Sequence, residues 1–162
     1  MSKDKNIHQY LDELKEYAKE SGYFLNPDPD FLFELAKGLY ENEQRYGYPA
    51  CPCRLSKGDR EKDLDIICPC DYRDPDLSEF GTCYCALYVD EETAKGNKDF
   101  EPIPDRRKSE KSKTKTIVSP AFSKSTYPIW RCKVCGYLCA REAPPEKCPI
   151  CKVSKDRFEQ LG

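Results

Sequence analysis

Apolar residues recur at helical spacing in two stretches near the start of the chain. In residues 6–20 they fall every three to four positions, as on one face of an amphipathic helix, and Gly22 follows as a stop signal. Asp28 and Pro29 are typical of a cap and a first-turn proline, which predicts a second helix to about Gln44. We interpret the aromatic residues of both helices as core packing.

The helical pattern then becomes short and broken. Residues 59–67 have helical composition, with Asp59 as a candidate cap, and residues 74–76 open a short helical turn that Gly81 closes. Most cysteines therefore fall at element ends and in loops, where free backbone amides can donate hydrogen bonds to sulfur.

Charge divides the chain into three segments. The net charge is −11 in residues 1–105, +6 in residues 106–126 and +3 in residues 127–162. The middle segment mixes Lys, Ser and Thr with few apolar groups, which predicts a basic linker between two small domains. Such a linker is either solvated or attracted to an acidic surface, the first domain's own or a partner's.

The ends and the apolar runs indicate where the protein works. No run approaches the length of a membrane helix, and the first residues lack an apolar signal segment. We therefore expect a cytoplasmic protein without a membrane partner. The acidic first domain also makes a nucleic-acid partner a poor expectation.

Eleven cysteines are the outstanding feature of the composition. In a reducing compartment they indicate metal ligands or redox groups, and their odd number argues against a closed disulfide framework. His8 is the single histidine, so chemistry that needs a histidine base or ligand is nearly excluded. We interpret His8 as a surface residue.

Six of the cysteines form three Cys-Xaa-Cys units: Cys51-Pro52-Cys53, Cys68-Pro69-Cys70 and Cys83-Tyr84-Cys85. Six thiols are two more than a cubane cluster or a tetrahedral zinc site needs. The pattern therefore predicts four ligands and two thiols left beside the metal. A zinc site with spare thiols and an electron-carrying cluster with idle cysteines remain the alternatives.

Three such units in this order resemble the catalytic chain of ferredoxin:thioredoxin reductase, over roughly residues 5–100. The resemblance implies that a [4Fe–4S] cluster binds to Cys51, Cys68, Cys70 and Cys83. It implies that Cys53 and Cys85 form the redox-active disulfide. It further implies ferredoxin as the electron donor and a thioredoxin-like protein as the disulfide substrate.

The chain departs from that family inside the third unit. The family usually has histidine between these cysteines, where it is thought to handle protons, and this chain has Tyr84. Tyrosine can donate a hydrogen bond but is a poor base at neutral pH. Tyr84 is therefore either a catalytic residue or a packing group. Residues 72–80 resemble a local insertion.

Two Cys-x₂-Cys pairs follow near the end of the chain: Cys132, Cys135, Cys148 and Cys151. Two such knuckles predict a tetrahedral four-sulfur site for iron or zinc, and on this pattern alone a structural zinc ribbon is equally acceptable. Residues 127–162 also resemble rubredoxin, especially the version at the end of rubrerythrins. This implies a mononuclear iron centre, which zinc can replace in recombinant protein, with Trp130, Tyr137 and Phe158 as core.

Together these features predict a small all-α iron–sulfur domain followed by a small rubredoxin-like β knuckle domain. The combination resembles the ferredoxin:disulfide reductases of methanogenic archaea that carry a fused rubredoxin domain. The expected function is reduction of protein disulfides, and the competing hypothesis is an electron carrier without disulfide chemistry. Cys139, the eleventh cysteine, is expected to be a free thiol without a role.

Overall fold

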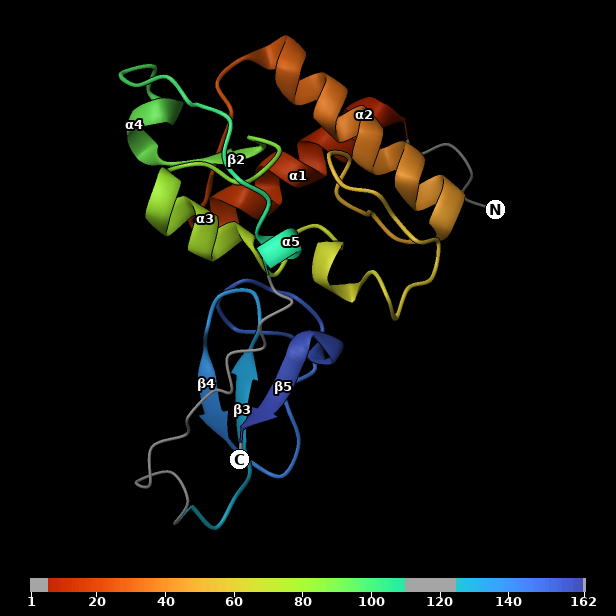
Figure 1. Ribbon diagram of the computed structural model, residues 1–162, viewed down its shortest axis with the longest axis vertical. Coiled ribbons are helices and arrows are strands. Elements are labelled where there is room, and N and C mark those ends of the chain that lie inside the picture. Colours follow the sequence, from red (N-terminus) through yellow and green to blue (C-terminus); the bar gives the residue numbers. More distant parts are fainter. Residues whose placement is uncertain (1–5, 110–124, 162) are drawn as a thin grey trace. The chain divides into compact units, whose positions relative to one another are not determined.

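The computed structural model describes residues 6–109 and 125–161, and the chain divides into two compact units, Met1–Pro104 and Asp105–Gly162 (Figure 1). The predicted linker, residues 106–126, begins with the short helix α5 (Arg106–Ser109), and residues 110–124 lie outside the described part. Within the described residues, no helix is both long enough and apolar enough to cross a membrane.

Two capped helices form the framework of the first unit. Helix α1 (Ile7–Ser21) ends at Gly22, whose φ of 75° is left-handed, and α2 (Pro29–Tyr46) begins at Asp28, whose carboxylate accepts from two backbone amides. Both predicted helices are confirmed to within two residues at each end. Their facing sides supply much of the buried core: Leu11, Ala18, Leu32, Leu35, Ala36 and Leu39.

The segment after α2 folds mostly without regular helix. The predicted helix at 59–67 is wrong, because only the 3₁₀ turn η1 (Leu64–Ile66) forms there. Fully buried Asp63 accepts hydrogen bonds from Tyr48 Oη and the Lys57 amide, both at 2.8 Å, so it fastens the segment as a loop. The later short helix was predicted correctly: α3 (Arg73–Phe80) ends at a left-handed Gly81.

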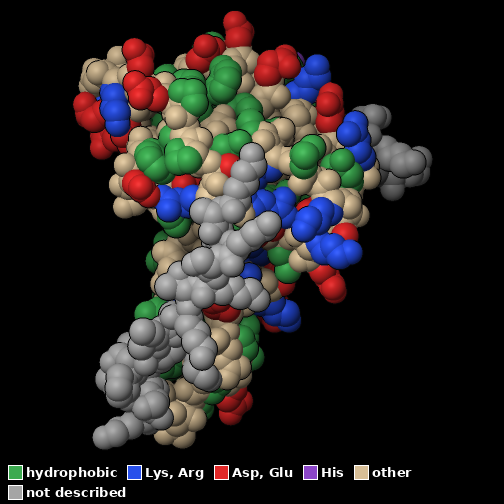
Figure 2. All heavy atoms as spheres, in the orientation of Figure 1, with side chains coloured by type: hydrophobic (Ala, Val, Ile, Leu, Met, Phe, Trp, Pro, Cys, Tyr) green, Lys and Arg blue, Asp and Glu red, His purple; other side chains and the backbone are tan. Residues whose placement is uncertain are grey.

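The first unit is helical but not wholly α. Strand β1 (Phe24–Leu25) pairs antiparallel with β2 (Tyr88–Val89), and helix α4 (Glu91–Ala94) follows β2. The all-α prediction missed this ribbon because two-residue strands are too short to leave an alternating pattern. The ribbon ties the connection between α1 and α2 to the segment after the third cysteine unit. Acidic side chains gather around α4 (Figure 2).

The second unit is a small antiparallel sheet with two loops. Strands β3 (Ile129–Cys132), β4 (Leu138–Ala140) and β5 (Phe158–Leu161) have the order β4-β3-β5, and the 3₁₀ turn η3 (Lys155–Arg157) leads into β5. The predicted β knuckle domain is confirmed. Its buried cluster is Cys132, Val134, Cys148, Cys151, Val153 and Phe158, with Trp130 and Tyr137 packed against it.

Candidate redox centres

Backbone hydrogen bonds bring the first two cysteine units together. Ala50 and Ile67 form an antiparallel bridge, the Cys51 amide donates to Ile66 at 2.8 Å, and the Cys68 amide donates to Pro49 at 2.8 Å. The two units, distant in sequence, therefore start side by side.

Hydrogen bonds to strand β2 fix the third Cys-Xaa-Cys unit. The Cys83 amide donates to the Tyr88 carbonyl at 2.9 Å, and the Tyr88 amide lies 3.3 Å from Cys83 Sγ. A backbone amide aimed at a sulfur stabilises the thiolate form. This agrees with the expectation that backbone amides near these cysteines donate hydrogen bonds to sulfur.

Five of the six cysteines line one small cavity. They are the four predicted cluster ligands and Cys85, and they share the lining with Arg54, Arg73, Tyr84, Leu87 and Tyr88. The sixth, Cys53, is absent from this lining and is exposed to solvent. The six cysteines are thus brought together, with five lining the cavity and one exposed.

Two buried guanidinium groups make the cavity suitable for an anion. Arg54 Nη1 lies 3.9 Å from Cys51 Sγ and 3.7 Å from Cys70 Sγ. Arg73 is fully buried; its Nε pairs with Asp74 at 2.9 Å, while its Nη2 atom has no hydrogen-bond partner among the described residues. Buried cationic donors favour a nearby anion. A cluster held by four thiolates is anionic, so the residues fit an iron–sulfur group.

Cys85 lies at the centre of the thiol network. Its thiol hydrogen-bonds to the sulfurs of Cys51, Cys53 and Cys83, which lowers the pKa of each of those three groups and raises the pKa of Cys85. Cys83 Sγ lies 3.8 Å from Cys85 Sγ. Cys53 thereby combines exposure with a lowered pKa, the two properties of a nucleophilic cysteine.

Burial acts differently on the cysteines of the second Cys-Xaa-Cys unit, Cys68 and Cys70. It raises the pKa of Cys68, and it raises the pKa of Cys70 to about 12. A bound cation is therefore needed to hold these two sulfurs as thiolates at neutral pH.

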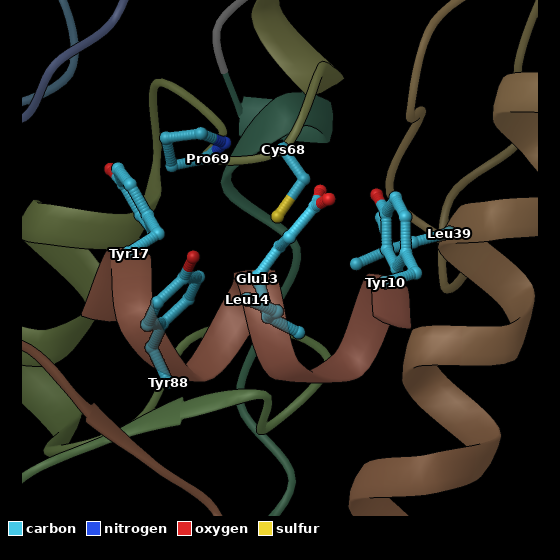
Figure 3. A pocket seen from close by; sticks show the side chains of 8 residues that line it. All are labelled: Tyr10, Glu13, Leu14, Tyr17, Leu39, Cys68, Pro69 and Tyr88. Atoms are coloured by element: carbon cyan, nitrogen blue, oxygen red, sulfur yellow. The ribbon is translucent and has the colours of Figure 1, made fainter. Parts of the chain in front are cut away.

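A second hollow reaches Cys68 from the side of α1. Figure 3 shows Cys68 Sγ pointing toward α1, from which Tyr10, Glu13 and Tyr17 extend. Tyr10 and Tyr17 also pack against the core, so their interpretation as core residues holds. The figure adds that the same face of the helix lies over a predicted cluster ligand.

The four paired cysteines of the C-terminal unit, residues 105–162, have the geometry of a mononuclear metal site. Their sulfurs all lie within 4.8 Å of one another, with Cys132–Cys151 at 3.6 Å and Cys135–Cys148 at 3.5 Å. A tetrahedron with bonds of about 2.3 Å has edges of about 3.8 Å, close to these distances. A hydrogen bond from Cys151 lowers the pKa of Cys132 to about 5.

Two knuckle turns hold these cysteines. The Gly136 amide donates to Cys132 at 2.9 Å and the Lys152 amide to Cys148 at 3.0 Å, and both residues have positive φ, 77° and 64°. Cys139 pairs with Trp130 across β4 and β3, and it is not part of the four-sulfur set.

Sequence reasoning did not identify Arg54 and Arg73 as part of the first site. Arg54 stands directly after Cys53, which was the one signal available. Tyr84 was identified, and the structure places it in the cavity lining with its ring 4.4 Å from the Arg54 guanidinium carbon.

Comparison with known proteins agrees with both sites. The model of the ferredoxin thioredoxin reductase catalytic beta chain matches residues 1–116, and the rubredoxin-like domain of rubrerythrin matches residues 130–159. The catalytic chain of ferredoxin-thioredoxin reductase from Porphyra purpurea is 28% identical over 97 residues, 54% of this chain and 78% of the relative.

Two further relatives cover the two units separately. The chloroplastic catalytic chain from Spinacia oleracea is 29% identical over 98 residues, 59% of this chain and 64% of its own length, slightly under two thirds. Reverse rubrerythrin-1 of Clostridium acetobutylicum is 47% identical over 32 residues, 20% of this chain and 18% of that protein.

The fold and its two cysteine sites define an iron-binding oxidoreductase with an iron–sulfur unit and a rubredoxin-like unit. More narrowly, the chain belongs to the family of ferredoxin-thioredoxin reductase catalytic chains.

Proposed function

We propose that the protein is an iron–sulfur disulfide reductase that takes single electrons from ferredoxin and reduces a thioredoxin-like protein in the cytoplasm. The observation that carries the proposal is the division of six thiols into five that line one cavity and one, Cys53, that is exposed. The proposed ligands of a [4Fe–4S] cluster are Cys51, Cys68, Cys70 and Cys83. Cys53 and Cys85 then remain for disulfide chemistry.

The thiol chemistry follows from exposure and pKa. The Cys53 thiolate attacks one sulfur of the substrate disulfide, which forms a mixed disulfide and releases one substrate thiolate. The Cys85 thiolate then attacks Cys53 Sγ, which releases the second substrate thiolate and leaves a Cys53–Cys85 disulfide. Cys85 is placed for this second step because its thiol hydrogen-bonds to Cys53, and since its pKa is raised it must give up its proton before it attacks.

Two electrons and two protons return the Cys53–Cys85 disulfide to the dithiol. The cluster, when bound, supplies the electrons one at a time from a one-electron donor. The protein contributes a cavity lining that places Cys85 beside the proposed ligand Cys83, with 3.8 Å between their sulfurs. Tyr84, between these two cysteines, is proposed as part of the same machinery.

The second unit is proposed to hold mononuclear iron for one-electron transfer. Its four sulfurs fit one tetrahedral ion, and iron rather than zinc gives a coloured protein with a ferric electron paramagnetic resonance signal. Rubredoxins usually have higher potentials than a cluster of this kind, so transfer from this centre into the cluster is expected to be uphill.

The test distinguishes the roles of Cys53 and Cys85. With a thioredoxin disulfide as substrate, Cys85→Ser is expected to accumulate a covalent complex through Cys53, visible on a non-reducing gel and by mass spectrometry. Cys53→Ser is expected to form none and to lose turnover, while both variants keep the iron content and absorption spectrum of the wild type. Cys139→Ser serves as the matched control.

The electron-carrier hypothesis makes the opposite prediction. Under that hypothesis both variants keep full electron transfer from ferredoxin, and the wild type reduces no disulfide. A wild-type protein with zinc instead of iron at the first site would reject both hypotheses.

A further inference from the structure

Arg54 is held inside the first unit by aromatic rings and sulfurs. Its side chain is buried, and its guanidinium carbon lies 4.9 Å from the centre of the Tyr72 ring and 4.4 Å from that of Tyr84. The same group contacts Cys51 and Cys70 through Nη1, at 3.9 and 3.7 Å. The positive charge is therefore placed between two ring faces and two proposed cluster ligands.

The local backbone explains why this arginine turns inward. The Arg54 amide donates to the Cys51 carbonyl at 3.2 Å, which closes a tight turn over the first cysteine unit. The neighbours on either side, Cys53 and Leu55, are exposed, and Leu55 is 91% exposed. The turn thus sends Arg54 toward the cavity while Cys53 faces solvent.

The two rings come from the other cysteine units. Tyr72 follows the second unit, and its hydroxyl donates to Asp65 Oδ2 at 2.7 Å, which fixes the ring. Tyr84 is the middle residue of the third unit and also lines the cavity. The stack on Arg54 therefore connects all three cysteine units through one cation.

We propose that Arg54 sets the reduction potential of the cluster and that Tyr84 is a positioning residue acting through Arg54. This inference rests on the proposed function, because it needs a cluster on Cys51 and Cys70. One-electron reduction adds negative charge among the cluster sulfurs. A fixed cation and N–H···S contacts in a poorly solvated site stabilise the reduced form, so they raise the potential.

The role of Tyr84 then depends on its ring and not on its hydroxyl. Stacking on guanidinium requires an aromatic face, which phenylalanine retains and leucine lacks. A proton-donating role requires the hydroxyl, which both substitutions remove. Tyr84→Phe and Tyr84→Leu therefore distinguish the two roles.

The experiment is a redox titration of the full-length protein, followed by the electron paramagnetic resonance signal of the reduced cluster. In Arg54→Gln, the ratio of reduced to oxidised cluster at a fixed potential is expected to fall about tenfold, equivalent to about 59 mV for one electron. Tyr84→Leu is expected to shift the ratio in the same direction, and Tyr84→Phe to change it less than twofold. The matched control is Arg45→Gln, which removes an exposed arginine stacked on Tyr46.

A second variant, Arg54→Lys, tests the inference if Arg54→Gln assembles its cluster poorly. Arg54→Lys keeps the charge but loses the planar stack and the fork of donors, so it is expected to fall between wild type and Arg54→Gln. An unchanged potential in Arg54→Lys and Tyr84→Leu would overturn the inference. So would equal shifts in Tyr84→Phe and Tyr84→Leu, which indicate a hydroxyl role. A wild type without a cluster would instead reject the proposed function before any variant is compared.

Discussion

The two units use cysteine in opposite ways. In the second unit four sulfurs converge on one point, with 3.5 and 3.6 Å between pairs, and backbone turns hold them. In the first unit five cysteines line a cavity together with two arginines, and the sixth, Cys53, is exposed to solvent. A metal site for electron transfer needs only four converging sulfurs, as in the second unit. Chemistry on a protein substrate also needs a sulfur that the substrate can reach, as in the first unit.

The units also differ in what forms their cores. The first buries leucines and alanines from two capped helices, and four of its cysteines belong to the same buried cluster. In the second, three of the six buried residues are metal-site cysteines. We therefore expect the second unit to depend on its metal for folding far more than the first.

The largest expected effect is loss of the metal in the second unit. Cys148→Ser removes a fully buried ligand, and metal binding at such sites contributes about 10 kcal/mol or more to folding. The second unit should unfold, seen as loss of dispersed amide signals for β3, β4 and β5, while those of the first unit stay in place. Cys139→Ser should leave both sets unchanged. A folded second unit in Cys148→Ser would contradict the comparison.

A smaller effect is expected from the buried cation of the first unit. Arg73 lies 3.6 Å from the Tyr23 ring centre and pairs with Asp74 at 2.9 Å. Arg73→Met should lower the free energy of unfolding of the first unit by about 3 kcal/mol, because it leaves a half-buried carboxylate without this partner. Urea denaturation measures this, with exposed Arg45→Met as the control, and a change under 1 kcal/mol would show that the core tolerates the loss.

The loop between the first two cysteine units should respond more weakly. Tyr48 and the Lys57 amide both donate to Oδ2 of Asp63, so Asp63→Asn can keep one acceptor oxygen there but replaces a charged acceptor by a neutral one, which weakens both bonds. We expect a loss of about 1–2 kcal/mol in unfolding free energy. Matched substitution of exposed Asp30 by Asn should cost less. Equal costs for the two would show that the loop is not fastened by Asp63.

The smallest effect is expected from removing the second unit altogether. A chain ending before residue 106 retains the whole buried cluster of the first unit. Its rate of ferredoxin-driven disulfide reduction should change less than twofold, since electron transfer from a rubredoxin-type centre into the cluster is expected to be uphill. A steady-state assay with thioredoxin measures the rate, and a large loss of activity would establish an obligatory relay.

Much of the fold was predictable because its signals are local. Helices α1 and α2 carry amphipathic spacing and end at Gly22 and Gly47, as capping rules require. The ribbon of β1 and β2 was not predictable, since two residues carry no period. The segment 59–67 misled the prediction because Asp63, which suits a helix by composition, binds groups outside it.

The residues of the two sites likewise divide into those that the sequence predicts and those that it cannot predict. Cysteine spacing alone marks the ten cysteines of both sites and predicts a four-sulfur metal site for the last four of them, and the structure brings those four sulfurs within 4.8 Å of one another. The place of Arg73 depends on Tyr23 and Tyr88, which reach it through the pairing of β1 with β2. A buried cation is recognisable only when such distant partners are known, so the sequence could not identify it.

The outward position of Cys53 also exposes the protein to damage. Among the described residues, which include all eleven cysteines, Cys53 is the one that is exposed, and its pKa is lowered. A peroxide would therefore convert Cys53 to a sulfenic acid first. The Cys85 thiol, hydrogen-bonded to Cys53, can condense with that acid, releasing water and forming the disulfide of the proposed catalytic cycle. Under the proposed function, oxidation at this position would thus end in a state that the same electron donor reduces again.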